Sequence, residues 1–112
     1  MTAQPSSPPV AALALADLPA GQTRAIVLSG LAILLCHDEG RIFAVENRCS
    51  HLDEPLTCGH LRFGRIVCPA HGARFDLASG APIGPPASTA LRTFPVSVIA
   101  GVIHVSLGNQ DG

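Results

Sequence analysis

Apolar residues occur along the chain in short runs separated by turn-forming residues, and no helical stripe of apolar positions extends over ten or more residues. Short runs rich in Val, Ile and Leu are typical of β-strands. The pattern therefore predicts an all-β domain. The expected strands cover residues 10–13, 25–28, 31–36, 42–45, 66–68, 74–77, 91–99 and 102–107.

Glycine-containing segments predict where the chain reverses direction, because glycine readily adopts the positive φ that tight hairpin turns need. Such turns are expected at Ser29-Gly30, at 38–40, at 78–80 and at Ala100-Gly101. Pro95 interrupts the expected strand 91–99. Since proline donates no hydrogen bond to a sheet, Pro95 should lie at a sheet edge or a bulge.

Other stretches do not resemble strands. Residues 47–60, 69–73 and 83–87 combine polar residues with Gly and Pro, and predict loops. Residues 1–9 are polar and proline-rich, which predicts a flexible N-terminal tail, and residues 108–112 form a short C-terminal tail. The folded domain should therefore extend over residues 10–107.

Composition narrows the class of protein. A chain of 112 residues has room for one domain with a modest core, so we expect no second catalytic domain. The formal net charge is −1 and the seven basic residues, all arginines, form no run, which argues against nucleic acid as a partner. The longest apolar stretch, 25–36, is too short to span a bilayer.

The expected compartment is the cytoplasm. The apolar segment 10–18 has no basic residue before it and contains Asp17, which does not fit a signal peptide. In the cytoplasm the four cysteines should be thiols or metal ligands rather than disulfides.

Two of the expected loops contain paired Cys and His residues. Cys49 and His51 form a Cys-x-His motif, and Cys68 and His71 form a Cys-x-x-His motif. Thiolate and imidazole ligands suit an iron–sulfur cluster or zinc, and exclude magnesium and calcium. In a Rieske cluster two Cys bind one iron and two His bind the other, so each of these loops would give one ligand to each metal.

At these motifs the chain resembles the Rieske-type [2Fe–2S] ferredoxins of bacterial aromatic-ring-hydroxylating dioxygenase systems, from Val10 to Leu107. The resemblance includes Asn47-Arg48-Cys49-Ser50-His51 with Pro55-Leu56, Cys68-Pro69-Ala70-His71-Gly72, Phe75-Asp76 and Ser79-Gly80, and Pro85-Pro86 is similar to the family's proline loop. It implies an antiparallel β-sandwich base and a smaller, loop-rich cluster-binding subdomain at about 47–87.

The resemblance also implies a cofactor and partners. Cys49 and Cys68 would bind the buried iron of one [2Fe–2S] cluster, and His51 and His71 the outer iron. The chain would be a non-catalytic, monomeric carrier that takes electrons from a flavin-dependent NAD(P)H ferredoxin reductase. It would pass them to a terminal oxygenase through transient contacts at the cluster tip, without binding nucleic acid or a membrane.

The sequence departs from the high-potential members of this family. They carry a disulfide between the cluster loops, where this chain has Glu54 and Ala70. They also place a Ser and a Tyr hydroxyl against the cluster sulfurs, at positions that correspond here to Ala73 and Phe75. Hydroxyl donors stabilise the charge of the reduced cluster, so their replacement, with Asp53 and Glu54 beside His51, predicts a low reduction potential.

Alternatives stay open at this point. Cys58 and His60 form a second Cys-x-His pair that could contribute to a structural zinc site. The chain could also be an accessory Rieske-like subunit of another oxidoreductase, such as a nitrite reductase. Cys36 ends an apolar strand and is expected to be a small buried hydrophobe. Cys58 is expected to be a free thiol.

Overall fold

The computed structural model describes residues 9–48, 56, 59–68, 72–84 and 89–107, and within these ranges it consists mainly of β-strands. The strands are β1 (Val10–Ala14), β2 (Thr23–Leu28), β3 (Leu31–Asp38), β4 (Arg41–Glu46), β5 (His60–Arg62), β6 (Arg65–Val67), β7 (Arg74–Asp76), β8 (Thr93–Phe94), β9 (Val96–Ile99) and β10 (Val102–Val105). A single 3-10 turn, η1 (Leu15–Asp17), is the only helical element in the described ranges. The predicted all-β class is confirmed.

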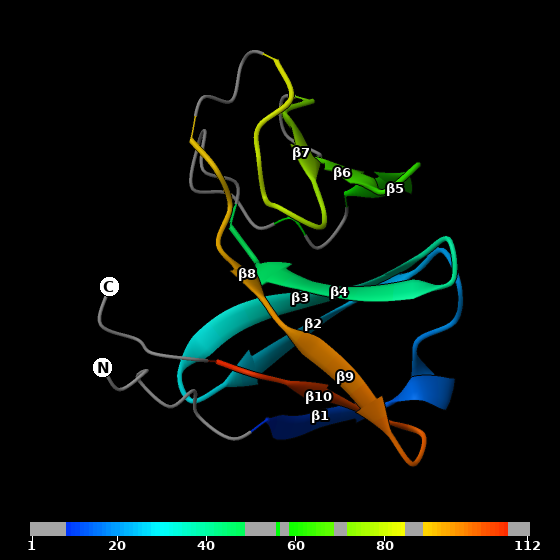
Figure 1. Ribbon diagram of the computed structural model, residues 1–112. Helices are drawn as coiled ribbons and strands as arrows, with labels where there is room; N and C mark the ends of the chain where they lie inside the picture. Colours follow the sequence, from blue (N-terminus) through cyan, green and yellow to red (C-terminus); the bar gives the residue numbers. More distant parts are fainter. Residues whose placement is uncertain (1–8, 49–55, 57–58, 69–71, 85–88, 108–112) are drawn as a thin grey trace, which may run out of the picture.

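The strands form three antiparallel sheets (Figure 1). The strand orders are β1-β10-β9, β2-β3-β4-β8 and β5-β6-β7. The first two sheets lie together in the lower half of Figure 1 and form the base, and the small third sheet stands above them. None of the described segments forms a helix that is long and apolar enough to cross a membrane.

Strand β3 connects the two hydrophobic cores of the molecule. Its residues Ile33, Leu34, Leu35 and Cys36 are all fully buried. Successive side chains of a strand point to opposite faces, so Ile33 and Leu35 enter the core of the base, while Leu34 and Cys36 enter a second core beneath the β5-β6-β7 sheet. A strand buried on both faces has a continuous apolar sequence, which explains the run 31–36.

The tight turns follow the glycines. Four hairpins have positive φ at both central residues, as type I′ turns require: Ser29-Gly30, Glu39-Gly40, Phe63-Gly64 and Ala100-Gly101. The turn predicted at 78–80 is also present, with the Gly80 N–H donating to the Asp76 carbonyl oxygen at 2.7 Å. The Phe63-Gly64 hairpin was not expected, because Phe rarely adopts positive φ.

One strand prediction is wrong, and one strand was not predicted. The expected strand 91–99 is divided at Pro95 into β8, at the edge of one base sheet, and β9, at the edge of the other. Pro95 thus lies between two edge strands, as its missing N–H predicts. Strand β5 begins at His60, the last residue of the expected loop 47–60, and extends to Arg62.

Candidate metal centre

Cys68 is the one predicted ligand that lies in the described part of the structure, since Cys49, His51 and His71 lie outside it. Cys68 directly follows β6 and its side chain is buried. Its N–H donates to the Ala73 carbonyl oxygen at 2.6 Å, and its carbonyl oxygen accepts from the Gly72 N–H at 3.0 Å. Both backbone groups of Cys68 therefore close the segment that contains His71.

The segment that contains Cys49 and His51 is closed in a similar way. The Asn47 side-chain oxygen Oδ1 accepts a hydrogen bond from the Leu56 N–H at 2.8 Å. Leu56 is fully buried in the core beneath the third sheet, so this bond ties the segment to a fixed point. The motif residue Asn47 thus has a structural role that the sequence did not identify.

The ends of the two motif-bearing segments also contact each other. Gly59 packs so closely on β6 that a Cβ atom there would lie 2.6 Å from the Val67 carbonyl oxygen. Next in the chain, His60 pairs with Val67, the residue before Cys68. The ends of the two motif-bearing segments are therefore held side by side, which is the arrangement that a shared metal centre needs.

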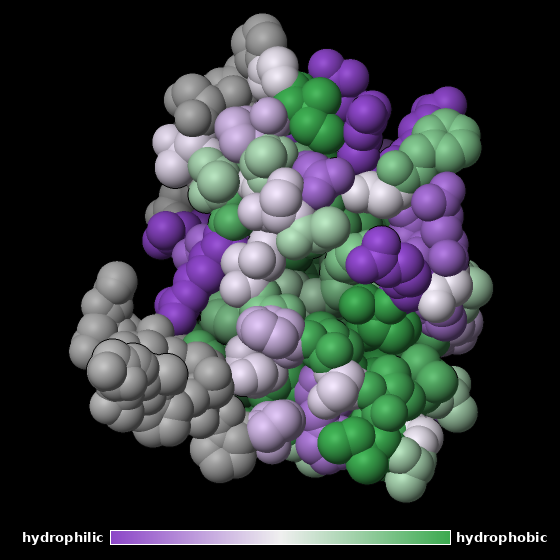
Figure 2. All heavy atoms as spheres, viewed as in Figure 1, coloured by the Kyte–Doolittle hydropathy of each residue, from purple (hydrophilic) through white to green (hydrophobic). Residues whose placement is uncertain are grey.

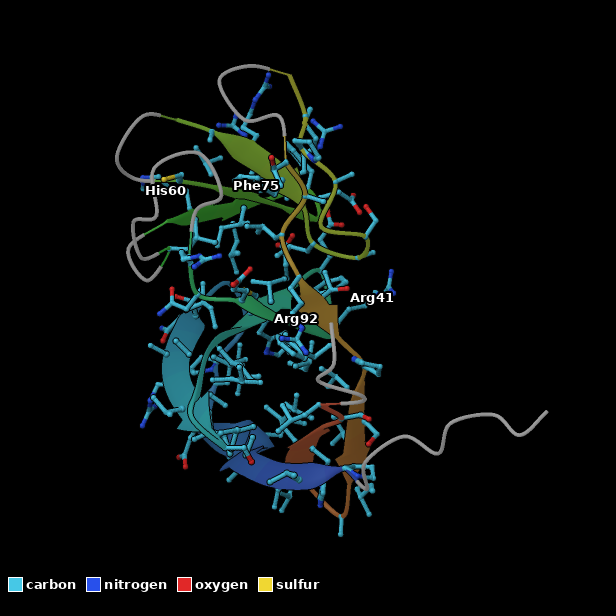
Figure 3. The ribbon with its side chains drawn as sticks, turned by 90° about the vertical axis from the view of Figure 1, so that its left-hand side faces the viewer. Arg41, His60, Phe75 and Arg92 are labelled. Carbon is cyan, nitrogen blue, oxygen red and sulfur yellow. The ribbon has the colours of Figure 1, made fainter. Side chains whose placement is uncertain are left out.

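The core around Cys68 is apolar. Ala73 and Phe75 are fully buried in the same hydrophobic cluster, and Figure 3 shows Phe75 inside the upper part of the molecule. Neither residue carries a hydroxyl group. Cys36 is also in this cluster, where it is a small buried residue as predicted, and it is a free thiol. Burial raises the pKa of its thiol to about 12, with a further contribution from Asp38, so Cys36 stays protonated at neutral pH.

A buried carboxylate joins the small sheet to the base. The Asp38 oxygen Oδ2, at the end of β3, accepts a hydrogen bond from the Gly64 N–H at 2.5 Å. The Gly64 carbonyl oxygen in turn accepts from the Leu77 N–H at 2.9 Å. Because both backbone groups of Gly64 are bonded, the β5–β6 turn is fixed against the base, and the small sheet has a defined orientation.

The donor chemistry of this region fits an iron–sulfur centre. A buried thiol at the start of a hydrogen-bonded loop is a soft ligand that is shielded from water, as a cluster iron requires. Within the described residues no group of three or more His, Cys, Asp or Glu side chains is placed to bind a metal. The three other predicted ligands lie outside these residues. The exposed His60 lies on β5 (Figure 3), and its proposed zinc partner Cys58 is outside the described residues.

Three antiparallel sheets and a buried thiol, Cys68, in a hydrogen-bonded segment place the chain among small all-β proteins with a candidate soft metal ligand. The Rieske [2Fe-2S] domain model matches residues 9–95, and the chain belongs to this family. The family's Rieske-type [2Fe–2S] cluster is therefore its cofactor.

Relatives and solved structures agree with this assignment. The chain is 32% identical over 89 residues to the ferredoxin component of the naphthalene 1,2-dioxygenase system of Pseudomonas putida, with 80% of this chain and 86% of the relative covered. The ferredoxin of carbazole 1,9a-dioxygenase from Nocardioides aromaticivorans IC177 has a TM-score of 0.83 and 32% identity, over 88% of this chain and 97% of that one. A complex of reduced oxygenase and oxidized ferredoxin in carbazole 1,9a-dioxygenase contains a chain with a TM-score of 0.82 and 27% identity, over 88% and 92%. The predicted resemblance to dioxygenase ferredoxins is confirmed.

Proposed function

We propose that this protein is the one-electron carrier of a ring-hydroxylating dioxygenase system. It takes electrons from a flavin-dependent NAD(P)H ferredoxin reductase and passes them to the terminal oxygenase. The observation that carries the proposal is the likeness to ferredoxin components in both sequence and fold, over most of their length. The chain itself transforms no substrate in this scheme, and it acts as a monomer in the cytoplasm.

Four residues are proposed as ligands. Cys49 and Cys68 bind the inner iron, and His51 and His71 bind the outer iron. The burial of Cys68 and the closed segment that follows it support this assignment. The domain would extend over residues 10–107, with the cluster subdomain at about 47–87 and tails at 1–9 and 108–112.

The protein's own residues hold the cluster-binding segments in place and exclude water. The bound cluster supplies reversible one-electron transfer between two oxidation states. The hydrogen bonds of Asn47 and Cys68 hold the two motif-bearing segments, and the apolar core around Phe75 keeps water from the inner side of the centre. In this proposal a partner approaches the centre from its outer side.

Purification and reconstitution test the proposed function. The protein should be red-brown, contain equal amounts of iron and acid-labile sulfide, and bleach on reduction by dithionite. Mixed with NADH, a ferredoxin reductase and the terminal oxygenase of the carbazole system, it should support hydroxylation that stops when it is omitted. A colourless protein that contains zinc would contradict the proposal and favour a structural zinc module.

The reduction potential should lie in the lower part of the Rieske range of about −150 to +300 mV, below zero. The reason is that Ala73 and Phe75 offer no hydroxyl donor from the buried side of the centre. Protein-film voltammetry at neutral pH measures the potential. Phe75→Tyr should raise it, whereas Phe94→Tyr, which adds the same hydroxyl in the separate core of the base, should leave it unchanged. A wild-type potential well above zero would contradict this explanation.

A further inference from the structure

The outward face of the β5-β6-β7 sheet is unusually rich in arginine. Strand alternation sends Leu61, Ile66 and Phe75 inward, where they pack in the core. The register then leaves two rows on the outer face: His60, Val67 and Arg74 in one, and Arg62, Arg65 and Asp76 in the other. In Figure 2, strongly hydrophilic residues gather in the upper right part of the molecule, where Figure 1 shows the β5–β6 hairpin.

The second row contains an unfavourable pair. Arg62 and Arg65 are direct cross-strand partners, and like charges in such positions destabilise a sheet. Asp76, the cross-strand partner of Arg65, offsets at most one of these two charges. Its carboxylate also accepts two hydrogen bonds from Ser79, at 2.9 Å each, and these bonds are the main cause of its lowered pKa. This face therefore keeps a positive charge although the chain as a whole is slightly acidic.

Phe63 stands at the tip of the same hairpin. It is 74% exposed and has a φ of +50°, a conformation that is unfavourable for a bulky side chain. The Arg62 guanidinium lies 5.8 Å from the centre of its ring. Because Gly64 is hydrogen-bonded to both Asp38 and Leu77, the tip is fixed and presents the ring to solvent. An exposed aromatic residue in a strained, fixed turn is typical of a binding element.

The side chains enclose a hollow. Arg62, Phe63, Arg65, Val67 and Arg74 line a surface depression of about 290 Å³. Its lining combines the half-buried Val67 with three exposed arginines. Arginine and aromatic residues are the side chains most enriched where protein interfaces gain their binding energy. The hollow therefore fits an apolar side chain that is surrounded by carboxylates.

We propose that this arginine face, defined by Arg62, Phe63, Arg65 and Arg74, is a docking surface for a carboxylate-rich patch of the terminal oxygenase. The inference rests on the proposed electron-carrier function and adds a second contact with the oxygenase, beside the cluster tip. Arg74 directly follows Ala73, whose carbonyl oxygen accepts a hydrogen bond from the Cys68 N–H, so one end of the arginine face lies next to the proposed ligand Cys68. A partner seated over the centre can reach the arginines, which attract its carboxylates and orient it before electron transfer.

Stopped-flow electron transfer tests the docking surface. The dithionite-reduced protein is mixed with the oxidised terminal oxygenase of carbazole 1,9a-dioxygenase from Nocardioides aromaticivorans IC177, at low and high salt. Arg62→Gln/Arg65→Gln should lower the second-order rate about tenfold at low salt and flatten its salt dependence. Its melting temperature should be unchanged or higher, because the like-charge pair is removed. Arg24→Gln/Arg41→Gln, which removes two positive charges from β2 and β4 of the base, is the matched control and should leave the rate unchanged.

Phe63→Asn separates binding from folding. Asn tolerates positive φ and favours type I′ turns, so this variant should melt at the same or a higher temperature. It should nevertheless lower the rate of electron transfer to the oxygenase. A purely structural Phe63 would give the opposite result, a lower melting temperature at an unchanged rate.

The possible results distinguish the two proposals. Wild-type rates and salt dependence in Arg62→Gln/Arg65→Gln, an equal loss in Arg24→Gln/Arg41→Gln, or a loss only in transfer from the reductase would overturn the docking surface. A wild-type protein that carries a reducible cluster and yet transfers no electron to the oxygenase would contradict the proposed function instead.

Discussion

Replacing His71 by Ala should give a colourless protein without acid-labile sulfide. The proposed centre has four protein ligands, two on each loop, and the loss of one leaves an iron open to solvent. Cluster content falls from full occupancy to near zero, which visible absorption and iron analysis measure directly. The base should keep its far-ultraviolet circular dichroism, because its core between the two larger sheets contains no residue of the motif-bearing segments.

Cys58→Ser is the matched control for this experiment. Cys58 is in the second Cys-x-His pair and is proposed to bind no metal, so the variant should assemble the cluster at the wild-type level. Loss of the cluster in Cys58→Ser, together with its retention in His71→Ala, would show that the ligand assignment from the motif is wrong. The same comparison tests the zinc alternative, because a zinc module that uses Cys58 would lose its metal in this variant.

The sequence predicted most of the base because its strands follow local rules. The continuous apolar run 31–36 and the glycine turns at 30, 40 and 101 each need only neighbouring residues to be interpreted. Strand β5 was not predicted, since its three residues are too few for an apolar period and depend on pairing with β6. The Phe63-Gly64 turn was missed for a related reason, because Phe is not a residue that indicates a type I′ turn.

Only part of the site could be predicted from the sequence. The spacing of Cys and His identified the donor types, but it could not show how the two segments meet. That depends on contacts between distant parts of the chain, such as the Asp38–Gly64 hydrogen bond and the packing of Gly59 on Val67. The arginine face could not be predicted for the same reason, because Arg62, Arg65 and Arg74 become neighbours only through the register of three strands.

Gly80→Ala should destabilise the protein far more than Gly30→Ala, although both glycines have nearly the same φ, +77° and +79°. An alanine in this left-handed region costs about 1 kcal/mol at either position. At Gly30 nothing lies within 4 Å of the added Cβ, so no further cost arises. At Gly80 the Cβ would lie 2.1 Å from the Leu91 carbonyl oxygen, which forces the backbone to move. The total loss there should be about 3 kcal/mol or more.

The larger loss of stability in Gly80→Ala should also weaken retention of the cluster. The Gly80 carbonyl oxygen accepts a hydrogen bond from the Leu91 N–H at 2.8 Å, which closes the segment between them, including the proposed proline loop at Pro85-Pro86. Urea unfolding of both variants measures the free energies, and the rate at which the visible spectrum fades measures cluster retention. Gly80→Ala should lose its cluster faster than Gly30→Ala at the same urea concentration. Equal unfolding free energies would mean that the backbone at Leu91 moves away from the added Cβ atom without loss of stability. The fold would then not depend on this close approach.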